Sequence, residues 1–298
     1  MDYVVVSTAV TDDLTLADGT HIGYRLGGAG IYAMSGIRLW TDQVALVTGV
    51  GEDFAQLYAS WFAENGCTML GLTVKDAHTA VSNVQYHADG ERTETPQYGG
   101  AHYRMLEAAP DDIAPFTETA KGVYIFKDLN DAYWDRILQL KRRHGFKLLW
   151  EINADAAVPE QRERVQKLAR QCDVFSINRT EACKLFSENQ LDWVIAKLQT
   201  WGVPMIYLRM GGSGAAVLHD SICERIPCMP NVSVVDATGA GNSSSAAVLY
   251  GYCEGMPPKV CGILGSVAAA HIIEQYGPPS FSPTETARAL AEVKQMSI

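Results

Sequence analysis

Residues 234–245 read Val-Val-Asp-Ala-Thr-Gly-Ala-Gly-Asn-Ser-Ser-Ser, and the apolar run Ala-Ala-Val-Leu-Tyr follows at 246–250. The β-branched pair predicts a strand end, the small residues predict a tight turn, and the alanine-rich run predicts a buried helix that begins near Asn242. Gly239 and Gly241 allow an anion to approach the backbone, and the free N–H groups at the start of a helix stabilise negative charge. The stretch therefore predicts an anion-binding turn.

Composition and charge exclude several classes of protein. A chain of 298 residues is long enough for one large α/β domain or two smaller ones. Its net charge of −10 argues against a surface that tracks nucleic-acid phosphates. It has no apolar run of membrane-spanning length and no recognisable signal peptide at its start. We therefore expect a cytoplasmic protein without nucleic-acid or membrane partners, whose seven scattered cysteines are reduced thiols.

Strand and helix candidates alternate along most of the chain, which is typical of a mostly parallel sheet covered by helices on both faces. The predicted strands are 3–7, 44–49, 123–126, 147–152, 174–177 and 205–208. The predicted helices are 31–37, 54–64, 132–144, 159–172, 191–201, 257–275 and 283–295. Two further segments, 14–25 and 79–97, alternate in polarity around the pairs Asp18-Gly19 and Asp89-Gly90, as β-hairpins do.

The opening stretch, from Asp236 to Ser243, closely resembles the C-terminal signature of the ribokinase-like (PfkB-type) carbohydrate kinases. In that family the turn forms an anion hole for the transferred phosphoryl group. The family's catalytic Asp, which takes the proton from the acceptor hydroxyl, is Asn242 in this chain. The resemblance implies that the remaining residues of the anion hole and its phosphate contacts are Asp236, Thr238, Gly239, Ala240 and Gly241.

A second motif follows the predicted strand 174–177. Asn178 and Glu181 have the spacing of a helix capping box, which by itself predicts only a helix start. The family carries an Asn-x-x-Glu motif at this place, whose carboxylate helps to position Mg²⁺ and phosphate through water. The two roles are compatible, and we expect both.

A third motif is the glycine-rich turn 209–214, Arg-Met-Gly-Gly-Ser-Gly. A hairpin would explain the glycines without any ligand. In the family, a Gly-x-x-Gly turn here lies along the ATP phosphates, which makes Gly211 and Gly214 candidate contacts. Arg209 is either a bidentate phosphate ligand or an exposed, solvated side chain.

The N-terminal part matches the family more faintly. The family places a substrate-binding Asp after the first strand and a Gly-Gly pair at the start of the next helix. Tyr32 stands where the family usually has an Asn that holds sugar hydroxyls, and Asn153 lies where the family often has an Asp-x-Asn segment, although it equally fits a polar residue leaving a buried strand. The substrate-site candidates are Asp12, Asp13, Gly27, Gly28, Tyr32 and Asn153.

Taken together, the resemblance implies one ribokinase-like α/β domain over residues 1–298. Segments of about 14–26 and 79–103 would form a small β-sheet lid, although two surface hairpins without a lid role remain the alternative. The implied ligands are ATP, Mg²⁺ and a sugar or nucleoside, with a monovalent cation as a further candidate. A lid sheet with an exposed edge also favours a homodimer.

The neutral amide of Asn242 has no basic lone pair with which to take a proton. General-base catalysis contributes about 10²–10⁴-fold to rate, whereas positioning and charge neutralisation dominate phosphoryl transfer. Three interpretations follow: a kinase that uses another base or needs none, a family member that binds nucleotide and sugar as a sensor or partner protein, and an enzyme trapped by an introduced Asn. The phosphate-compatible glycines and the Asn178–Glu181 motif favour the kinase.

Overall fold

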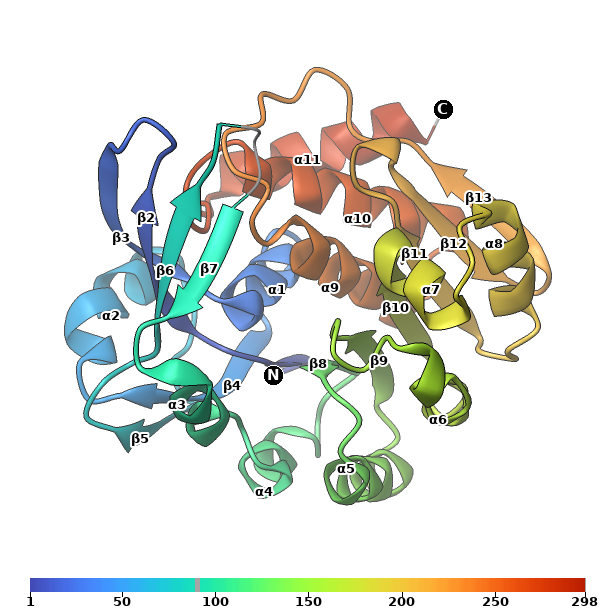
Figure 1. The fold of residues 1–298 in the computed structure, drawn as a ribbon, viewed down its shortest axis with the longest axis horizontal. Helices are drawn as coiled ribbons and strands as arrows, with labels where there is room; N and C mark the ends of the chain where they lie inside the picture. Colours follow the sequence, from blue (N-terminus) through green and yellow to red (C-terminus); the bar gives the residue numbers. More distant parts are fainter. Residues whose placement is uncertain (89–91, 298) are drawn as a thin grey trace.

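The computed structural model describes residues 1–88 and 92–297 of the chain (Figure 1). The strands are β1 (Tyr3–Val6), β2 (Val10–Thr15), β3 (His21–Gly27), β4 (Val44–Gly51), β5 (Leu72–Asp76), β6 (Val81–Tyr86), β7 (Arg92–Pro96), β8 (Gly122–Lys127), β9 (Lys147–Ile152), β10 (Val174–Asn178), β11 (Met205–Arg209), β12 (Ala215–His219) and β13 (Ile222–Ile226). The helices are α1 (Ala29–Arg38), α2 (Phe54–Glu64), α3 (Gly99–Leu106), α4 (Pro110–Ile113), α5 (Asp131–His144), α6 (Arg162–Ala169), α7 (Arg179–Phe186), α8 (Leu191–Gln199), α9 (Ala240–Cys253), α10 (Pro258–Ile273) and α11 (Pro283–Met296).

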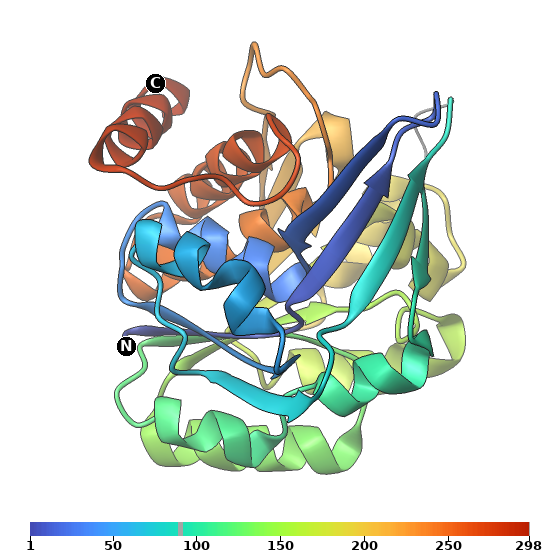
Figure 2. The same ribbon diagram turned by 90° about the vertical axis from the view of Figure 1, so that its left-hand side faces the viewer.

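Two sheets organise the described part of the chain. The large sheet has nine strands in the order β13-β12-β11-β10-β9-β8-β1-β4-β5, parallel from β11 to β5 and antiparallel on both sides of β12. The small sheet has the order β3-β2-β6-β7 and stands to one side of the helices (Figure 2). The predicted α/β fold, with a mostly parallel sheet and a small second sheet, is confirmed.

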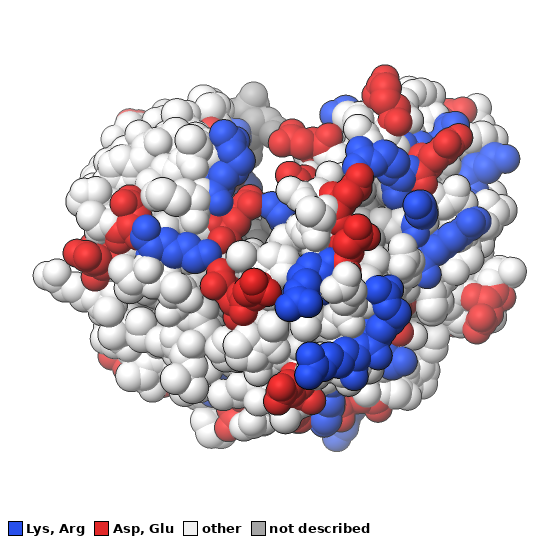
Figure 3. Space-filling view, turned by 90° about the horizontal axis from the view of Figure 1, so that it is seen from below, with Lys and Arg blue, Asp and Glu red and all other residues white. Residues whose placement is uncertain are grey.

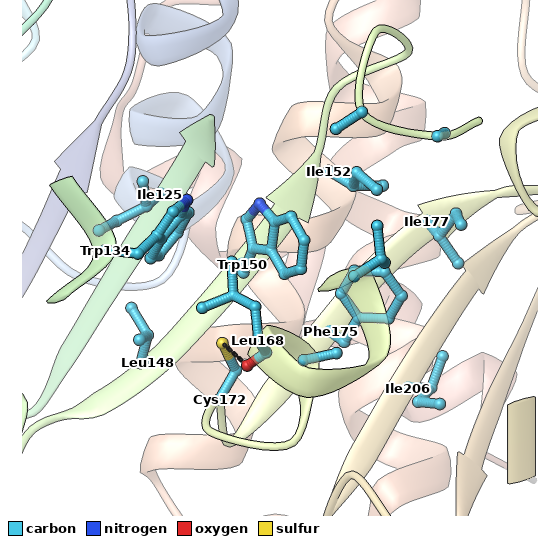
Figure 4. Close-up of a cluster of buried hydrophobic side chains, with 14 of the residues drawn as sticks. Ile125, Trp134, Leu148, Trp150, Ile152, Leu168, Cys172, Phe175, Ile177 and Ile206 are labelled. Atoms are coloured by element: carbon cyan, nitrogen blue, oxygen red, sulfur yellow. Dashed lines mark hydrogen bonds between the residues drawn. The ribbon is translucent and has the colours of Figure 1, made fainter. Parts of the chain in front are cut away.

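Helices cover both faces of the large sheet because its strands are apolar on both sides. Helices α1, α2, α9 and α10 pack on one face, and α5, α6, α7 and α8 pack on the other. Figure 4 shows part of the second layer, where Trp150 of β9 contacts Trp134 of α5 and Phe175 of β10. Burying such side chains contributes about 25 cal/mol per Å² of apolar surface to folding.

Successive side chains of a strand point to opposite faces of the sheet, and this alternation places several polar side chains on the face that α9 covers. Tyr124, Glu151, Ser176 and Arg209 come from the adjacent strands β8, β9, β10 and β11, and Glu151 is in register with Ser176. In each strand the neighbouring residues belong to the apolar core of the opposite face. Because the carboxyl ends of parallel strands lie at one edge of the sheet, these four side chains meet near the start of α9.

Several predicted boundaries are wrong. Val234 and Val235 form no strand; they lie in an exposed loop where the Val235 N–H donates to the Ile273 carbonyl, because no strand lies beside them to pair with. Helix α6 is shorter than the predicted 159–172, since a separate 3₁₀ turn occupies Pro159–Gln161. Strand β4 continues to Gly51, and edge strand β5 was not predicted because it is only partly buried and lacks an apolar run.

Both hairpins of the small sheet agree with the polarity pattern. The pair β2–β3 contains the Asp18-Gly19 turn, and the pair β6–β7 flanks the predicted Asp89-Gly90 turn, which lies outside the described residues. The seven cysteines are free thiols, as predicted.

The molecular surface carries both charge signs. Figure 3 shows one face on which Lys and Arg side chains alternate with Asp and Glu side chains, so that neither sign covers the face. Within the described residues, no helix is both long enough and apolar enough to cross a membrane.

Candidate active site

The turn that the sequence predicts as an anion site leads directly into α9. Gly239 has a φ of 80°, and a Cβ atom at this position would overlap the Tyr32 ring. A Cβ atom on Gly241 would overlap the Arg209 guanidinium. Gly239 is therefore required by its conformation and its close contact, whereas a side chain at position 241 would have to displace the Arg209 guanidinium. The turn presents its backbone N–H groups at a helix N-terminus.

Asp236 fixes the shape of this turn from its N-terminal side. Its Oδ1 atom accepts hydrogen bonds from the Thr238 backbone N–H at 2.9 Å and from the Thr238 hydroxyl at 2.6 Å. The Asp236 side chain is buried and lines neither of the two cavities described next. Its position indicates that it supports the turn.

Two cavities share the turn as part of their walls. The larger encloses about 850 Å³, and the smaller about 270 Å³. The turn residues that line the larger cavity are Ala237, Ala240 and Gly241. Those that line the smaller cavity are Thr238, Gly239 and Asn242. Different residues of one turn therefore contribute to the wall of each cavity.

The larger cavity combines glycine-rich backbone with an apolar wall. Gly211 and Gly214, both with positive φ, line it in the β11–β12 hairpin, where a Cβ atom on Gly214 would overlap the Ile226 carbonyl. Its apolar lining comes mainly from Met229, Val232, Val234, Ala269, Ala270 and Ile273. A ligand with an anionic end and an apolar end matches this arrangement.

The smaller cavity contains a buried carboxyl group. Asp12 lies inside β2 with 7% of its surface exposed, and no Cβ atom fits on Gly27 because the Asp12 carboxylate fills that space. Burial, together with the charges of Glu94 and Asp236, raises the pKa of Asp12 to about 8. A protonated carboxyl group can both donate and accept hydrogen bonds, so Asp12 could contact a hydroxyl in this cavity from either role.

Not every predicted substrate residue reaches this cavity. Asp12 and Asp13 were expected beyond the end of a strand, but both lie within β2. Because successive side chains of a strand point to opposite faces, Asp13 points away from the smaller cavity and contacts His21. Asn153 caps a local turn, with its Oδ1 atom accepting from the Ala156 N–H at 3.1 Å. Gly28 lines the cavity at a φ of 97°.

Asn242 is held by two neighbours. Its Nδ2 atom donates to Glu151 Oε1 at 3.0 Å and to the Tyr124 hydroxyl at 3.2 Å, and Tyr124 donates to Glu151 Oε2 at 2.9 Å. Because a carboxylate only accepts hydrogen bonds, the amide nitrogen must face Glu151. No residue within 1–88 and 92–297 donates to the Oδ1 atom of Asn242, which lines the smaller cavity and can accept a hydrogen bond from a ligand.

Arg209 belongs to the same network, so the interpretation as an exposed, solvated side chain is wrong. Its side chain is only 14% exposed, and its Nη2 atom lies 3.2 Å from Glu151 Oε1 and 3.7 Å from Glu181 Oε2. Burial opposes its charge, but the carboxylates of Glu151 and Glu181 raise the pKa of Arg209. The residue is a buried cation beside the turn.

The predicted capping box at the start of α7 is present. Asn178 Oδ1 accepts from the Glu181 N–H at 2.8 Å, and Glu181 Oε2 accepts from the Asn178 N–H at 2.9 Å. Burial raises the pKa of Glu181. Asn178 lines the larger cavity, whereas Glu181 lies behind it against Arg209.

Sequence reasoning missed two site residues. Glu151 is 1% exposed and contacts Asn242, Arg209 and Tyr124. Its signal was a single carboxylate in strand β9, which is otherwise apolar after Lys147 at its start. Tyr124 gave no signal, because a Tyr in a buried strand usually serves packing.

The sequence of the chain is similar to those of known proteins. Residues 1–285 match the model of the pfkB family carbohydrate kinases. A nucleoside kinase from Methanothermobacter thermautotrophicus is 25% identical over 253 residues, which cover 84% of this chain and 79% of that protein.

Solved structures share the fold. An Arabidopsis thaliana ribokinase complexed with ribose and ATP is 19% identical, with a TM-score of 0.75 and 98% of each chain covered. An Escherichia coli chain classed as a ribokinase II, in complex with ATP and Mg²⁺, is 15% identical, with a TM-score of 0.78, and the match covers 97% of this chain and 99% of that one.

Proposed function

Because the chain belongs to the PfkB family of carbohydrate kinases, we propose that it transfers the γ-phosphoryl group of ATP to a hydroxyl of a sugar, sugar derivative or nucleoside. The observation that carries this proposal is the turn shared by the two cavities. A nucleotide in the larger cavity would direct its phosphates toward Gly241, and an acceptor in the smaller cavity would lie beside Asn242. Donor and acceptor would then meet at the start of α9, where backbone N–H groups stabilise the transferred charge.

We propose that Mg²⁺ binds beside the larger cavity, whose lining residue Arg209 lies 3.7 Å from the Glu181 carboxylate. Within the described part of the chain, no three His, Cys, Asp or Glu side chains form a ready-made metal site. Magnesium in such enzymes is usually held by one or two carboxylates together with substrate phosphates and water. Glu181, supported by Asn178, is the residue proposed to hold it through water. The ion would neutralise charge on the phosphate oxygens.

The small sheet is proposed as a lid over the acceptor. Arg92 and Glu94 of β7 line the smaller cavity, and their side chains pair at 2.8 Å. Edge strand β3 exposes 60% of Tyr24, which supports pairing with a second copy. Sedimentation of the purified chain over a range of concentrations tests this homodimer.

The first experiment is a ligand panel. Thermal unfolding is measured with Mg-ATP, with ribose, fructose, adenosine, inosine and 2-dehydro-3-deoxygluconate, and with and without potassium. Each ligand that raises the midpoint then enters a phosphate-transfer assay. A ligand well above its dissociation constant stabilises a protein by about 2–4 kcal/mol, so we expect ATP and one acceptor to raise the midpoint and ADP to form.

A second measurement places the nucleotide. Cys228 is exposed and lines the larger cavity, so a thiol reagent should modify it, and Mg-ATP should slow that modification. The variant Cys228→Ser serves as the control for labelling elsewhere. Stabilisation by ATP and acceptor without ADP formation would favour the alternative, a binding protein without turnover. No protection by any nucleotide would contradict the nucleotide site.

A further inference from the structure

The guanidinium of Arg209 lies directly against the anion-binding turn. Its Nε atom donates to the Ser176 hydroxyl at 3.2 Å, and its Nη2 atom pairs with Glu151 and, less closely, with Glu181. The Nη1 atom occupies the space where a Cβ atom of Gly241 would stand. Three anchors therefore fix a full positive charge beneath the backbone of the turn.

The Nη1 atom is the free end of this cation. Across residues 1–88 and 92–297, no oxygen accepts a hydrogen bond from Nη1. Arg209 and Gly241 both line the larger cavity. An anion bound at the turn would therefore find both backbone N–H groups and an unused guanidinium edge.

The charges around the turn differ from those of a site with a carboxylate at position 242. Asn242 is neutral, so it neither takes a proton nor repels an approaching phosphoryl group. The negative charge lies instead on Glu151, which is bound by Arg209, Asn242 and Tyr124. The site thus combines a fixed cation with a neutral hydrogen-bonding amide.

Building on the proposed kinase activity, we infer that Arg209 stabilises the transferring phosphoryl group and that Glu151 positions Arg209, which allows transfer with a neutral residue at 242. Arg209 is then a catalytic residue and Glu151 a positioning residue. In phosphoryl transfer an arginine that contacts the transition state contributes about 10³–10⁵-fold to rate. That range overlaps the range for a general base and extends about tenfold higher.

The transfer step balances without a base at position 242. A bond forms between the acceptor oxygen and the γ-phosphorus, and the bond from the γ-phosphorus to the β,γ-bridging oxygen breaks, its electron pair leaving with ADP. The acceptor hydroxyl donates a hydrogen bond to Asn242 Oδ1 but keeps its proton through the loose transition state. The proton then passes to an oxygen of the new phosphate monoester, which releases it to water because its second pKa is about 6.

The test compares the affinity for a ground-state ligand with the affinity for a mimic of the transition state. Arg209→Lys keeps the positive charge but loses the planar set of N–H donors of the guanidinium. Calorimetry with Mg-ADP and with Mg-ADP plus aluminium fluoride, a mimic of the transferring phosphoryl group, measures the two states separately. We expect Arg209→Lys to bind Mg-ADP within about threefold of the wild type and the aluminium fluoride complex about 10²-fold more weakly, with a similar fall in kcat and little change in the KM for ATP.

Two further variants serve as a control and as a second test of the same inference. Arg164→Lys is the matched control, because Arg164 pairs with Asp131 outside both cavities and its replacement should change neither affinity. Glu151→Gln retains the size of the side chain, and the same two affinities are measured in this variant if Arg209→Lys does not fold. It should show the same selective loss, of about tenfold, because the guanidinium loses its principal charged partner.

The outcomes also distinguish this inference from the proposed function. Equal losses of Mg-ADP and aluminium fluoride binding in Arg209→Lys, or no loss of either, would overturn the role of Arg209 while leaving the kinase intact. If the wild-type protein bound no Mg-ADP, the proposed function itself would fail.

Discussion

At the scale of single residues, the contact between Asn242 and Glu151 decides the chemistry of the site. The amide donates to a carboxylate that is 1% exposed and that also binds Arg209 and Tyr124. An Asp at position 242 would face Glu151 across the same distance. Residue 242 therefore cannot be considered separately from its neighbour in β9.

The first prediction concerns Asn242→Asp. Two buried carboxylates at hydrogen-bonding distance repel each other, so we expect this variant to lose about 1–3 kcal/mol of unfolding free energy near neutral pH. Urea unfolding measures the loss. The double variant Asn242→Asp with Glu151→Gln exchanges the two partners and should recover most of the stability. A single variant as stable as the wild type would show that the two side chains do not interact as described.

A second prediction concerns the pH dependence that Asp12 confers. Its pKa is raised from an ordinary value near 4 to about 8, so the folded state holds a proton that the unfolded state releases between these values. Its contribution to stability is complete below about pH 4 and is lost as the pH rises to about 8. Asp12→Asn removes this titration. The unfolding free energy of Asp12→Asn minus that of the wild type should therefore be more than about 1 kcal/mol higher at pH 8 than at pH 5.5. If the two proteins had parallel pH profiles, the raised pKa would be contradicted.

At the scale of elements, the capping box of α7 combines a structural and a proposed metal role. Glu181→Gln keeps an acceptor for the Asn178 N–H but removes the charge. We expect nearly unchanged stability and a lower nucleotide affinity in the presence of Mg²⁺ only. Glu181→Ala should lose, in addition, about 1 kcal/mol of stability through the lost cap. Unchanged Mg²⁺-dependent affinity in both variants would remove Glu181 from the metal site.

The packing of α1 against α9 gives a further prediction. A Cβ atom on Gly36 would overlap the backbone carbonyl of Ser243, so Gly36→Ala must push the two helices apart. We expect a loss of about 1–3 kcal/mol in urea unfolding, together with weaker nucleotide binding, because the turn proposed to bind the phosphates leads into α9. Gly100→Ala in α3 is the control, since a Cβ atom there meets only the end of the Arg104 side chain at 3.6 Å.

Periodicity and motif spacing predicted most elements, the two hairpins and the turn before α9. They did not predict edge strand β5, whose residues are partly exposed, and they assigned Val234 and Val235 to a strand because β-branched residues alone carry no information about a pairing partner. Glu151 was passed over for a similar reason. Its role depends on strand register and on α9, which follows it by about ninety residues, and no local pattern reports such contacts.

At the scale of the whole molecule, the order of the strands creates the site. The large sheet brings β8 to β11 side by side beneath the start of α9, and the small sheet adds β2, β6 and β7 around the second cavity (Figures 1 and 2). Segments from the beginning, middle and end of the chain thus meet at the turn of residues 237–242. The central claim is that a nucleotide and an acceptor approach this turn from opposite sides.

The most direct test uses a single compound that spans both cavities, made by joining the acceptor identified in the ligand panel to ADP through further phosphates. If the two sites meet at the turn, the second half binds intramolecularly, and titration calorimetry should give one site per chain with an affinity about 10²-fold or more above that of ATP alone. An affinity no better than that of ATP would show that donor and acceptor do not meet at residues 237–242, and it would contradict the account.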